Sequence, residues 1–188
     1  MSRGEDWSGL PAPEADGAAD HLTGLTMPSL ALPATDGHEV DFSGLAGWLV
    51  IYAYPKTGRA DVAAPSDWHM IPGAKGCTPQ SCAFRDHHAE LRDLGVDHLY
   101  GLSTQATDWQ SEAVERMHLP FALVSDARLR LADALRLPRF EVEGETLLRR
   151  LTLIVRDGII LRYFYPVFPP EDNAREVCDW LHAHALGS

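Results

Sequence analysis

Long apolar runs, basic residues and cysteines are what this sequence has little of. No apolar stretch approaches the roughly 18 residues that a membrane-spanning helix needs, and the N-terminus lacks the apolar segment of a secretory signal. Lysine and arginine number 16 against 27 aspartate and glutamate residues, which gives a net charge of -11. That balance argues against nucleic acid or an anionic membrane as a partner, since both favour a basic face. The three cysteines are too few, and odd in number, for a disulfide-stapled secreted domain, so we expect a cytoplasmic protein.

The chain has enough apolar residues for one sizeable core. It has 188 residues, of which 45% are hydrophobic and 23% charged, as in ordinary globular domains. Residues 1–22 differ from the rest because acidic, proline, glycine and alanine residues dominate them. We therefore expect a flexible acidic leader over residues 1–22 and a single domain over residues 23–188.

Strand and helix patterns alternate along the domain. Asp36-Gly37 is a strong turn signal and predicts an N-terminal hairpin with strands in 27–33 and 38–42. The continuous apolar run 48–54 predicts a central strand covered on both faces. The later pattern predicts helices over 79–94, 107–117, 126–135 and 171–185 and strands over 97–103, 121–124, 151–155 and 159–164. Thr107 and Asp126 are the expected caps of the middle two helices. This order indicates an α/β fold with a mixed sheet.

The best candidate for chemistry is Cys77, between a glycine-rich loop and a helix. The loop, residues 56–76, is long enough to indicate a functional role. A thiol at a helix N-terminus faces unpaired N–H groups and the positive end of the helix dipole, and both favour the reactive thiolate. The simpler interpretation of a lone cysteine is a small buried apolar residue, and we prefer it for Cys178.

The spacing of Cys77 and Cys82 excludes two common sites. It is not the Cys-x-x-Cys of thioredoxin-like redox motifs or of zinc sites. Five residues of helix place the two Cα atoms about 8–9 Å apart, whereas a disulfide needs less than about 7 Å. A bond between them therefore requires the helix start to unwind. The neighbouring His87 and His88 diverge by about 100° around a helix, so we expect no metal site there.

A family resemblance connects these features. The stretch Gly76–Asp86 has the pattern Gly-Cys-Thr-x-x-x-Cys-x-Phe-Arg-Asp and resembles the active-site helix of the peroxiredoxins. It is most similar to their Q-type subgroup, the bacterioferritin comigratory proteins. Tyr54-Pro55-Lys56 and Arg150-Leu151-Thr152 match two further, weaker motifs of that family. The resemblance covers about residues 25–185.

The resemblance implies a thioredoxin-like fold and a thiol-dependent peroxidase. Cys77 would attack the peroxide and become a sulfenic acid, and Cys82 would resolve it to an intramolecular disulfide. Arg150 would hold the Cys77 thiolate, while Arg149 would face away from it on the other side of the strand. The partners implied are hydrogen peroxide or an organic hydroperoxide and thioredoxin or a similar dithiol. We expect no cofactor, and a monomer or weak dimer.

The sequence departs from the family pattern in the loop before Cys77. Ala74 occupies the position of the family's hydroxyl residue, and about 15 residues are inserted after Tyr54-Pro55-Lys56. We expect Pro55 still to shield the pocket and Thr57 or Thr78 to supply the hydroxyl, with Ser66 as a further candidate.

The inserted segment allows two interpretations. The inserted Trp68, His69 and Met70 either wall the peroxide pocket or form a solvated surface loop. The missing hydroxyl also favours an alternative function, a non-enzymatic redox sensor or binding module on the same fold. A protein disulfide oxidoreductase is a weaker alternative because the Cys-x-x-Cys motif is absent.

Overall fold

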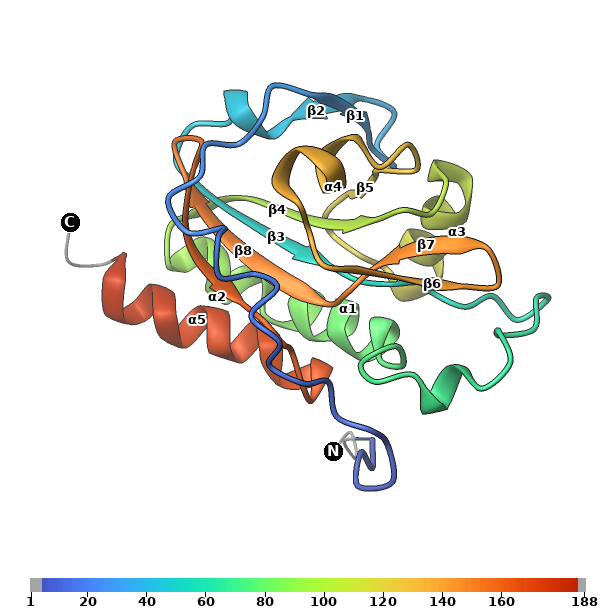
Figure 1. Cartoon of the computed structure of the whole chain (residues 1–188). Helices are drawn as coiled ribbons and strands as arrows, with labels where there is room; N and C mark the ends of the chain where they lie inside the picture. Colours follow the sequence, from blue (N-terminus) through green and yellow to red (C-terminus); the bar gives the residue numbers. More distant parts are fainter. Residues whose placement is uncertain (1–4, 186–188) are drawn as a thin grey trace.

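A five-stranded mixed sheet forms the centre of the protein. The computed structural model describes residues 5–185, and its sheet has the order β5-β4-β3-β8-β9 (Figure 1). The strands are β3 (Trp48–Ala53), β4 (Val96–Ser103), β5 (Leu123–Ser125), β8 (Leu151–Arg156) and β9 (Ile159–Phe164). β3, β4 and β5 run parallel, while β8 is antiparallel to both β3 and β9. The predicted α/β fold with a mixed sheet is therefore confirmed.

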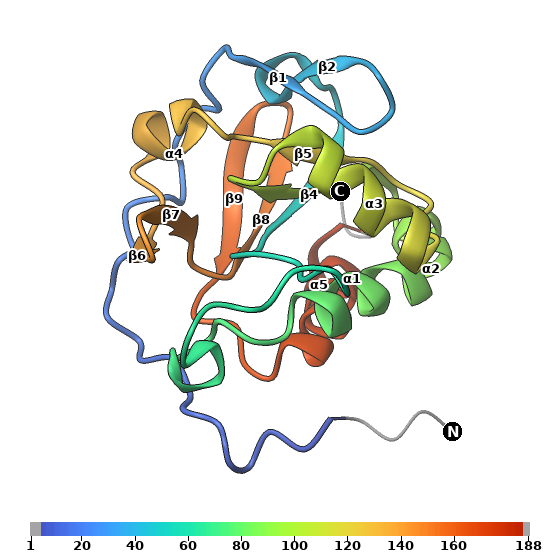
Figure 2. The ribbon, with the colours of Figure 1, turned by 90° about the vertical axis from the view of Figure 1, so that its right-hand side faces the viewer.

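The other elements lie on the two sides of the sheet. The helices are α1 (Cys77–Asp86), α2 (His88–Asp93), α3 (Thr107–Met117), α4 (Arg130–Leu135) and α5 (Asn173–His184). Two small hairpins are β1 (Ala31–Pro33) with β2 (Glu39–Asp41) and β6 (Arg139–Val142) with β7 (Glu145–Leu148). Figure 2 shows α1, α2 and α5 on one side of the sheet and α4 with β6 and β7 on the other. None of the helices in this part of the chain is long and apolar enough to cross a membrane.

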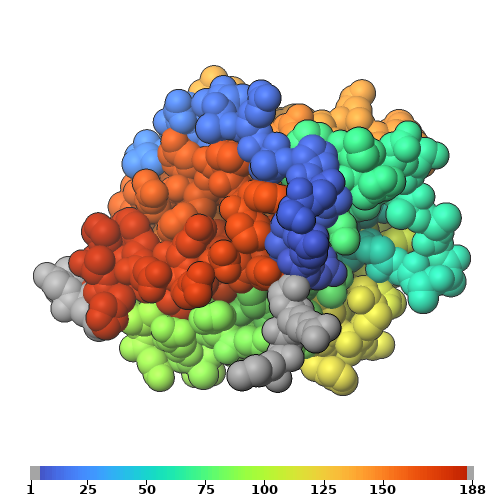
Figure 3. Space-filling view, turned by 90° about the horizontal axis from the view of Figure 1, so that it is seen from below, coloured from blue at the N-terminus to red at the C-terminus, as the bar shows by residue number. Residues whose placement is uncertain are grey.

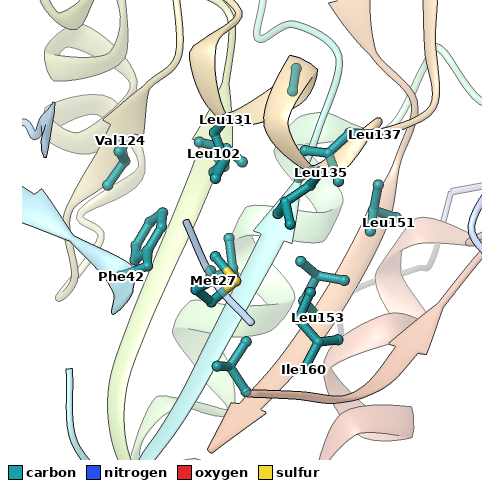
Figure 4. Close-up of a cluster of buried hydrophobic side chains, with 14 of the residues drawn as sticks. Met27, Phe42, Leu102, Val124, Leu131, Leu135, Leu137, Leu151, Leu153 and Ile160 are labelled. Carbon is teal, nitrogen blue, oxygen red and sulfur yellow. The ribbon is translucent and has the colours of Figure 1, made fainter. Parts of the chain in front are cut away.

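The central strand β3 contributes side chains to two hydrophobic clusters, one on each face of the sheet. Leu49 and Ile51 belong to the cluster that packs under α4 and the N-terminal segment, which Figure 4 shows. Val50 and Tyr52 belong to the cluster that packs against α1, α2, α3 and α5. Successive side chains of a strand point to opposite faces, so a strand covered on both faces is apolar throughout. The prediction from the run 48–54 is confirmed.

Several local predictions need correction. The predicted helix 79–94 is two helices, because α1 begins at Cys77 and the backbone breaks at His87 before α2. Thr107 is the first residue of α3 rather than its cap; Ala106 precedes the helix, and no side chain caps it. Asp126 does cap α4, since its carboxylate accepts hydrogen bonds from the backbone N–H groups of Leu131 and Ala132 at 3.1 and 2.8 Å.

The hairpin β6–β7 was missed by the sequence analysis, whereas the hairpin β1–β2 was predicted correctly. Asp36-Gly37 lies in the turn of β1–β2, but Glu143-Gly144 makes the turn of β6–β7. Both turn residues of β6–β7 have positive φ, at 49° and 81°, a conformation that glutamate seldom adopts. A turn without Asn or Asp before its glycine gives a weak sequence signal.

The described part of the leader packs against the domain. Ala19 and Leu22 are fully buried members of the core, and the Tyr163 hydroxyl donates a hydrogen bond to Asp20 at 2.8 Å. The predicted boundary at residue 22 therefore does not coincide with the edge of the core. The flexibility of the leader stays a prediction.

Gly101 on β4 provides a test of how tightly the sheet supports α1. A Cβ atom at Gly101 would lie 2.5 Å from Leu123 Cδ2 and 2.8 Å from Tyr52 Cζ. Tyr52 stacks on Phe84 and donates a hydrogen bond to Ser81, and both partners are on α1. We expect Gly101→Ala to lower the free energy of unfolding by about 1–3 kcal/mol in urea titrations. The control Gly44→Ala, whose Cβ would meet nothing within 4 Å, should change it little; equal effects would contradict this packing.

Candidate active site

The start of α1 is fixed by a glycine that no other residue can easily replace. Gly76 has φ of 120°, in the region that favours glycine. A Cβ atom at this position would lie 2.4 Å from Pro170 Cγ and 3.1 Å from Trp7 Cη2. α1 begins directly after Gly76, at Cys77, which is two residues before the predicted start at residue 79. Cys77 is buried, with 4% of its surface exposed.

Two donors reach the Cys77 sulfur from distant parts of the chain. The Arg150 guanidinium donates from Nη2 to Cys77 Sγ at 3.3 Å, and the Lys56 backbone N–H donates to the same sulfur at 3.4 Å. Arg150 is itself buried, and its guanidinium is a cation with several N–H donors. A fixed cation and a backbone dipole beside the sulfur both stabilise a thiolate over a thiol.

The Arg150 guanidinium is held in place by a chain of buried polar groups. Its Nη1 donates to Gln80 Oε1 at 2.6 Å, and Gln80 Nε2 donates to Asn173 Oδ1 at 3.1 Å. The Thr152 hydroxyl donates to the same Asn173 oxygen. All four side chains are buried, so water does not compete for these bonds. The carbonyls of residues 73–75 accept from Nη2 at 3.2–3.4 Å and fix its plane.

The hydroxyl candidates do not converge on the sulfur. The Thr57 hydroxyl is buried and donates to Gln105 Oε1 at 3.1 Å, while Ser66 is exposed in the inserted loop. Thr78 is half-buried in the first turn of α1. Pro55 is buried directly before Lys56, and its role in shielding the pocket stays a prediction. Besides Arg150, the donor to the sulfur is the Lys56 backbone N–H.

The inserted loop, residues 57–76, is a surface segment attached at a few points. Met70 is 59% exposed and His69 is exposed, so for these two residues the structure agrees with the second interpretation, a solvated surface loop. The Ser66 backbone N–H donates to Glu143 Oε1 at 3.0 Å, and Trp68 packs near Phe140 with ring centroids 6.4 Å apart. The hairpin β6–β7 therefore anchors the loop on the side away from α1.

Arg150 helps to line a cavity of about 350 Å³. The wall of this cavity combines apolar and charged side chains from the leader, the inserted loop, the hairpin β6–β7 with the residue that follows it, and the segment after β9: Pro11, Pro13, Pro72, Phe140, Arg149 and Tyr165. The predicted contrast between the two adjacent arginines is seen, since Arg149 lies over the Phe140 ring at 5.2 Å while Arg150 faces the sulfur. Residues 5–185 contain no group of three or more side chains suited to a metal ion.

The two core tyrosines and Cys178 stay protonated. Burial raises the pKa of Tyr52 and of Tyr54 well above the usual value, and the charge of nearby Cys77 acts in the same direction. Burial also raises the pKa of the Cys178 thiol to about 12, with Glu90 and Asp179 adding to the effect. Cys178 lies on α5 inside the core, as the sequence predicts for a cysteine without a chemical role.

Cys82 lies on the same helix as Cys77, and all three cysteines are free. The helix is continuous from Cys77 to Asp86, so the two Cα atoms are about 8–9 Å apart by helix geometry. A disulfide between them requires the first turn of α1 to open.

Sequence reasoning missed the residues that orient the arginine and the backbone donor. Gln80 and Asn173 do not belong to a motif that the sequence analysis recognised by its spacing. The N–H of Lys56 belongs to the backbone, so a pattern of side-chain types cannot predict that it donates a hydrogen bond. The only available signal was the Tyr54-Pro55-Lys56 motif itself, which places this peptide at the end of β3.

Comparisons with known proteins identify the family to which this chain belongs. Residues 22–178 match the Redoxin family. Peroxiredoxin Bcp of Escherichia coli (strain K12) is 29% identical over 171 residues, which is 86% of this chain and 96% of that protein. The crystal structure of peroxidoxin BcpB from Mycobacterium tuberculosis has a TM-score of 0.69 at 24% identity and covers 87% of this chain and 99% of its own. Peroxiredoxin Q of Xanthomonas campestris has a TM-score of 0.65 at 23% identity and covers 94% and 98%.

The fold and the sequence match define the class of protein: the chain belongs to the Redoxin family. Within that family it is a peroxiredoxin of the Q type, the bacterioferritin comigratory proteins, and therefore a peroxidase.

The burial of Cys178 predicts that it is chemically inert in the folded protein. With a pKa of about 12, on the order of one Cys178 thiol in ten thousand is ionised at pH 8. We expect iodoacetamide at pH 8 to leave Cys178 unmodified in the reduced native protein, as measured by peptide mass spectrometry. The same reagent should modify it fully in urea, and rapid labelling in the native state would contradict the buried placement.

Proposed function

We propose that this enzyme reduces hydrogen peroxide and small organic hydroperoxides at Cys77. The thiolate attacks one peroxide oxygen, the O–O bond breaks, and the other oxygen leaves as water or an alcohol after taking up a proton. Cys77 is then a sulfenic acid. The observation that carries this proposal is the buried Arg150 guanidinium, which lies 3.3 Å from the Cys77 sulfur.

In this step Arg150 and Lys56 also stabilise the negative charge that develops on the leaving oxygen. Negative charge moves from the sulfur to the leaving oxygen as the O–O bond breaks. Fixed donors that already point into the site stabilise such charge without reorganising. The guanidinium has several N–H donors. The backbone N–H of Lys56, in the segment that follows β3, adds one more donor to the same sulfur.

Cys82 resolves the sulfenic acid in the proposed cycle. Its sulfur attacks the Cys77 sulfur, water leaves, and an intramolecular disulfide forms once the first turn of α1 has opened. A dithiol such as thioredoxin then reduces the disulfide and is itself oxidised. We expect the cycle to run in the cytoplasm, where such dithiols are kept reduced, and the protein to act as a monomer or weak dimer.

Replacing each cysteine in turn tests this assignment. Peroxide consumption is followed with thioredoxin, its reductase and NADPH. We expect Cys77→Ser to abolish turnover because the nucleophile is lost. Cys82→Ser should react once and stop at a sulfenic acid that dimedone traps on Cys77. Cys178→Ala, the matched control, should turn over like the wild type.

The same assay separates the alternatives. Undiminished peroxide consumption by the Cys77→Ser variant would contradict the proposal. A wild-type protein that forms the Cys77–Cys82 disulfide but shows no turnover would instead be a redox sensor, the alternative that the missing hydroxyl at Ala74 favours.

A further inference from the structure

The N-terminal leader lies outside the family match and on the active-site loop. The match begins at residue 22, and residues 5–21 precede it without a helix or strand. Figure 3 shows this segment, in blue, between the green of the inserted loop and the orange of the chain that leads into α5. This part of the leader thus lies next to the start of α1.

Trp7 is the residue that attaches this part of the leader. Its Nε1 donates to Glu171 Oε1 at 3.1 Å, and its ring meets Phe168 edge-on with centroids 5.9 Å apart. The Lys75 ammonium lies 5.9 Å from the centroid of the same ring and 3.5 Å from the carboxylate of Glu5. Trp7 therefore links the segment before α5 to the two residues that precede Cys77.

The first turn of α1 is closed by contacts on both of its sides. The Gln80 backbone N–H donates to the Gly76 carbonyl at 3.0 Å, which is the bond that closes the turn. Gly76 fits between Pro170 and the Trp7 ring, with so little room that an added Cβ would clash with both. Opening the turn moves Gly76 and Lys75, so it must also break their contacts with Trp7.

We propose that Trp7 is a positioning residue that limits how fast the first turn of α1 opens. This inference rests on the proposed function, because the opening is the step that lets Cys82 reach Cys77. The sulfenic acid has two fates: attack by Cys82 gives the disulfide and water, and attack on a second peroxide gives a sulfinic acid and water or an alcohol. A slower opening favours the sulfinic acid, so Trp7 makes the enzyme more sensitive to excess peroxide.

The proposal is tested first on the reduced protein by hydrogen exchange of the backbone amides of residues 80–82. We expect Trp7→Ala to speed this exchange about fivefold or more, the factor that one ordinary hydrogen bond is worth. Trp7→Phe keeps an aromatic ring but loses the bond to Glu171, so it should have a smaller effect. Ser8→Ala is the matched control, because the Ser8 side chain is exposed and bonds only to Asp6 in the leader.

The second measurement is the fate of Cys77 at increasing hydrogen peroxide, read by intact mass. Trp7→Ala should form the disulfide faster and need a several-fold higher peroxide concentration to reach half sulfinic acid, while Ser8→Ala should match the wild type. Amides of β3 serve as a folding check, since general destabilisation would speed their exchange too.

Unchanged exchange at residues 80–82 in Trp7→Ala, or faster exchange with an unchanged sulfinic acid fraction, would overturn the proposal. Exchange needs no peroxidase activity, and disulfide formation can be driven by diamide instead of peroxide. The two proposals can therefore fail separately. If the wild-type protein consumes no peroxide, the proposed peroxidase cycle is wrong. The effect of Trp7→Ala on amide exchange and on diamide oxidation would still be observed in that case.

Discussion

The contact between the Arg150 guanidinium and the Cys77 sulfur is the interaction on which the rest of the structure depends. It joins the start of α1 to the residue before β8, which is 73 positions away in the chain. Burying a cation costs free energy unless its hydrogen bonds are satisfied. Gln80 and three backbone carbonyls accept from its Nη1 and Nη2 groups, while its buried Nε has no hydrogen-bond partner in the described part of the chain. The accepted bonds hold the charge close to the sulfur. β3 completes the site by placing the N–H of Lys56 beside the same atom.

Much of the fold could be predicted because the central strand β3 is apolar throughout, the other strands of the sheet carry short apolar stretches, and the helices are periodic. Cys77, Cys82 and Arg150 could be predicted as site residues because short motifs carry them, and their catalytic roles stay predictions. The positions of Gln80 and Asn173 could not, since their role comes from contacts between α1 and α5 that no local pattern encodes. The hydroxyl of Thr57 was misplaced for a related reason: its partner Gln105 lies 48 residues away.

The leader and the inserted loop meet near the start of α1. Both contribute to the cavity that Arg150 helps to line. The contacts of the leader include those of Trp7, and the contacts of the loop include those of Ser66 and Trp68 and the bonds from Arg150 to the carbonyls of residues 73–75. The proposed cycle requires the first turn of α1 to open, and contacts of about 1 kcal/mol each can be broken and remade during such local opening.

One measurement tests this account most directly. It is the stopped-flow rate constant for the reaction of the reduced protein with hydrogen peroxide, compared between the Arg150→Met and Arg149→Met variants. Arg150→Met keeps much of the side-chain volume but removes the cation and its bond to the sulfur. That loss, about 1.5–3 kcal/mol for a bond to a charged group, predicts a rate constant about 10- to 100-fold lower. Arg149→Met, one position away, should react like the wild type. Equal rates in the two variants would contradict the role given to Arg150.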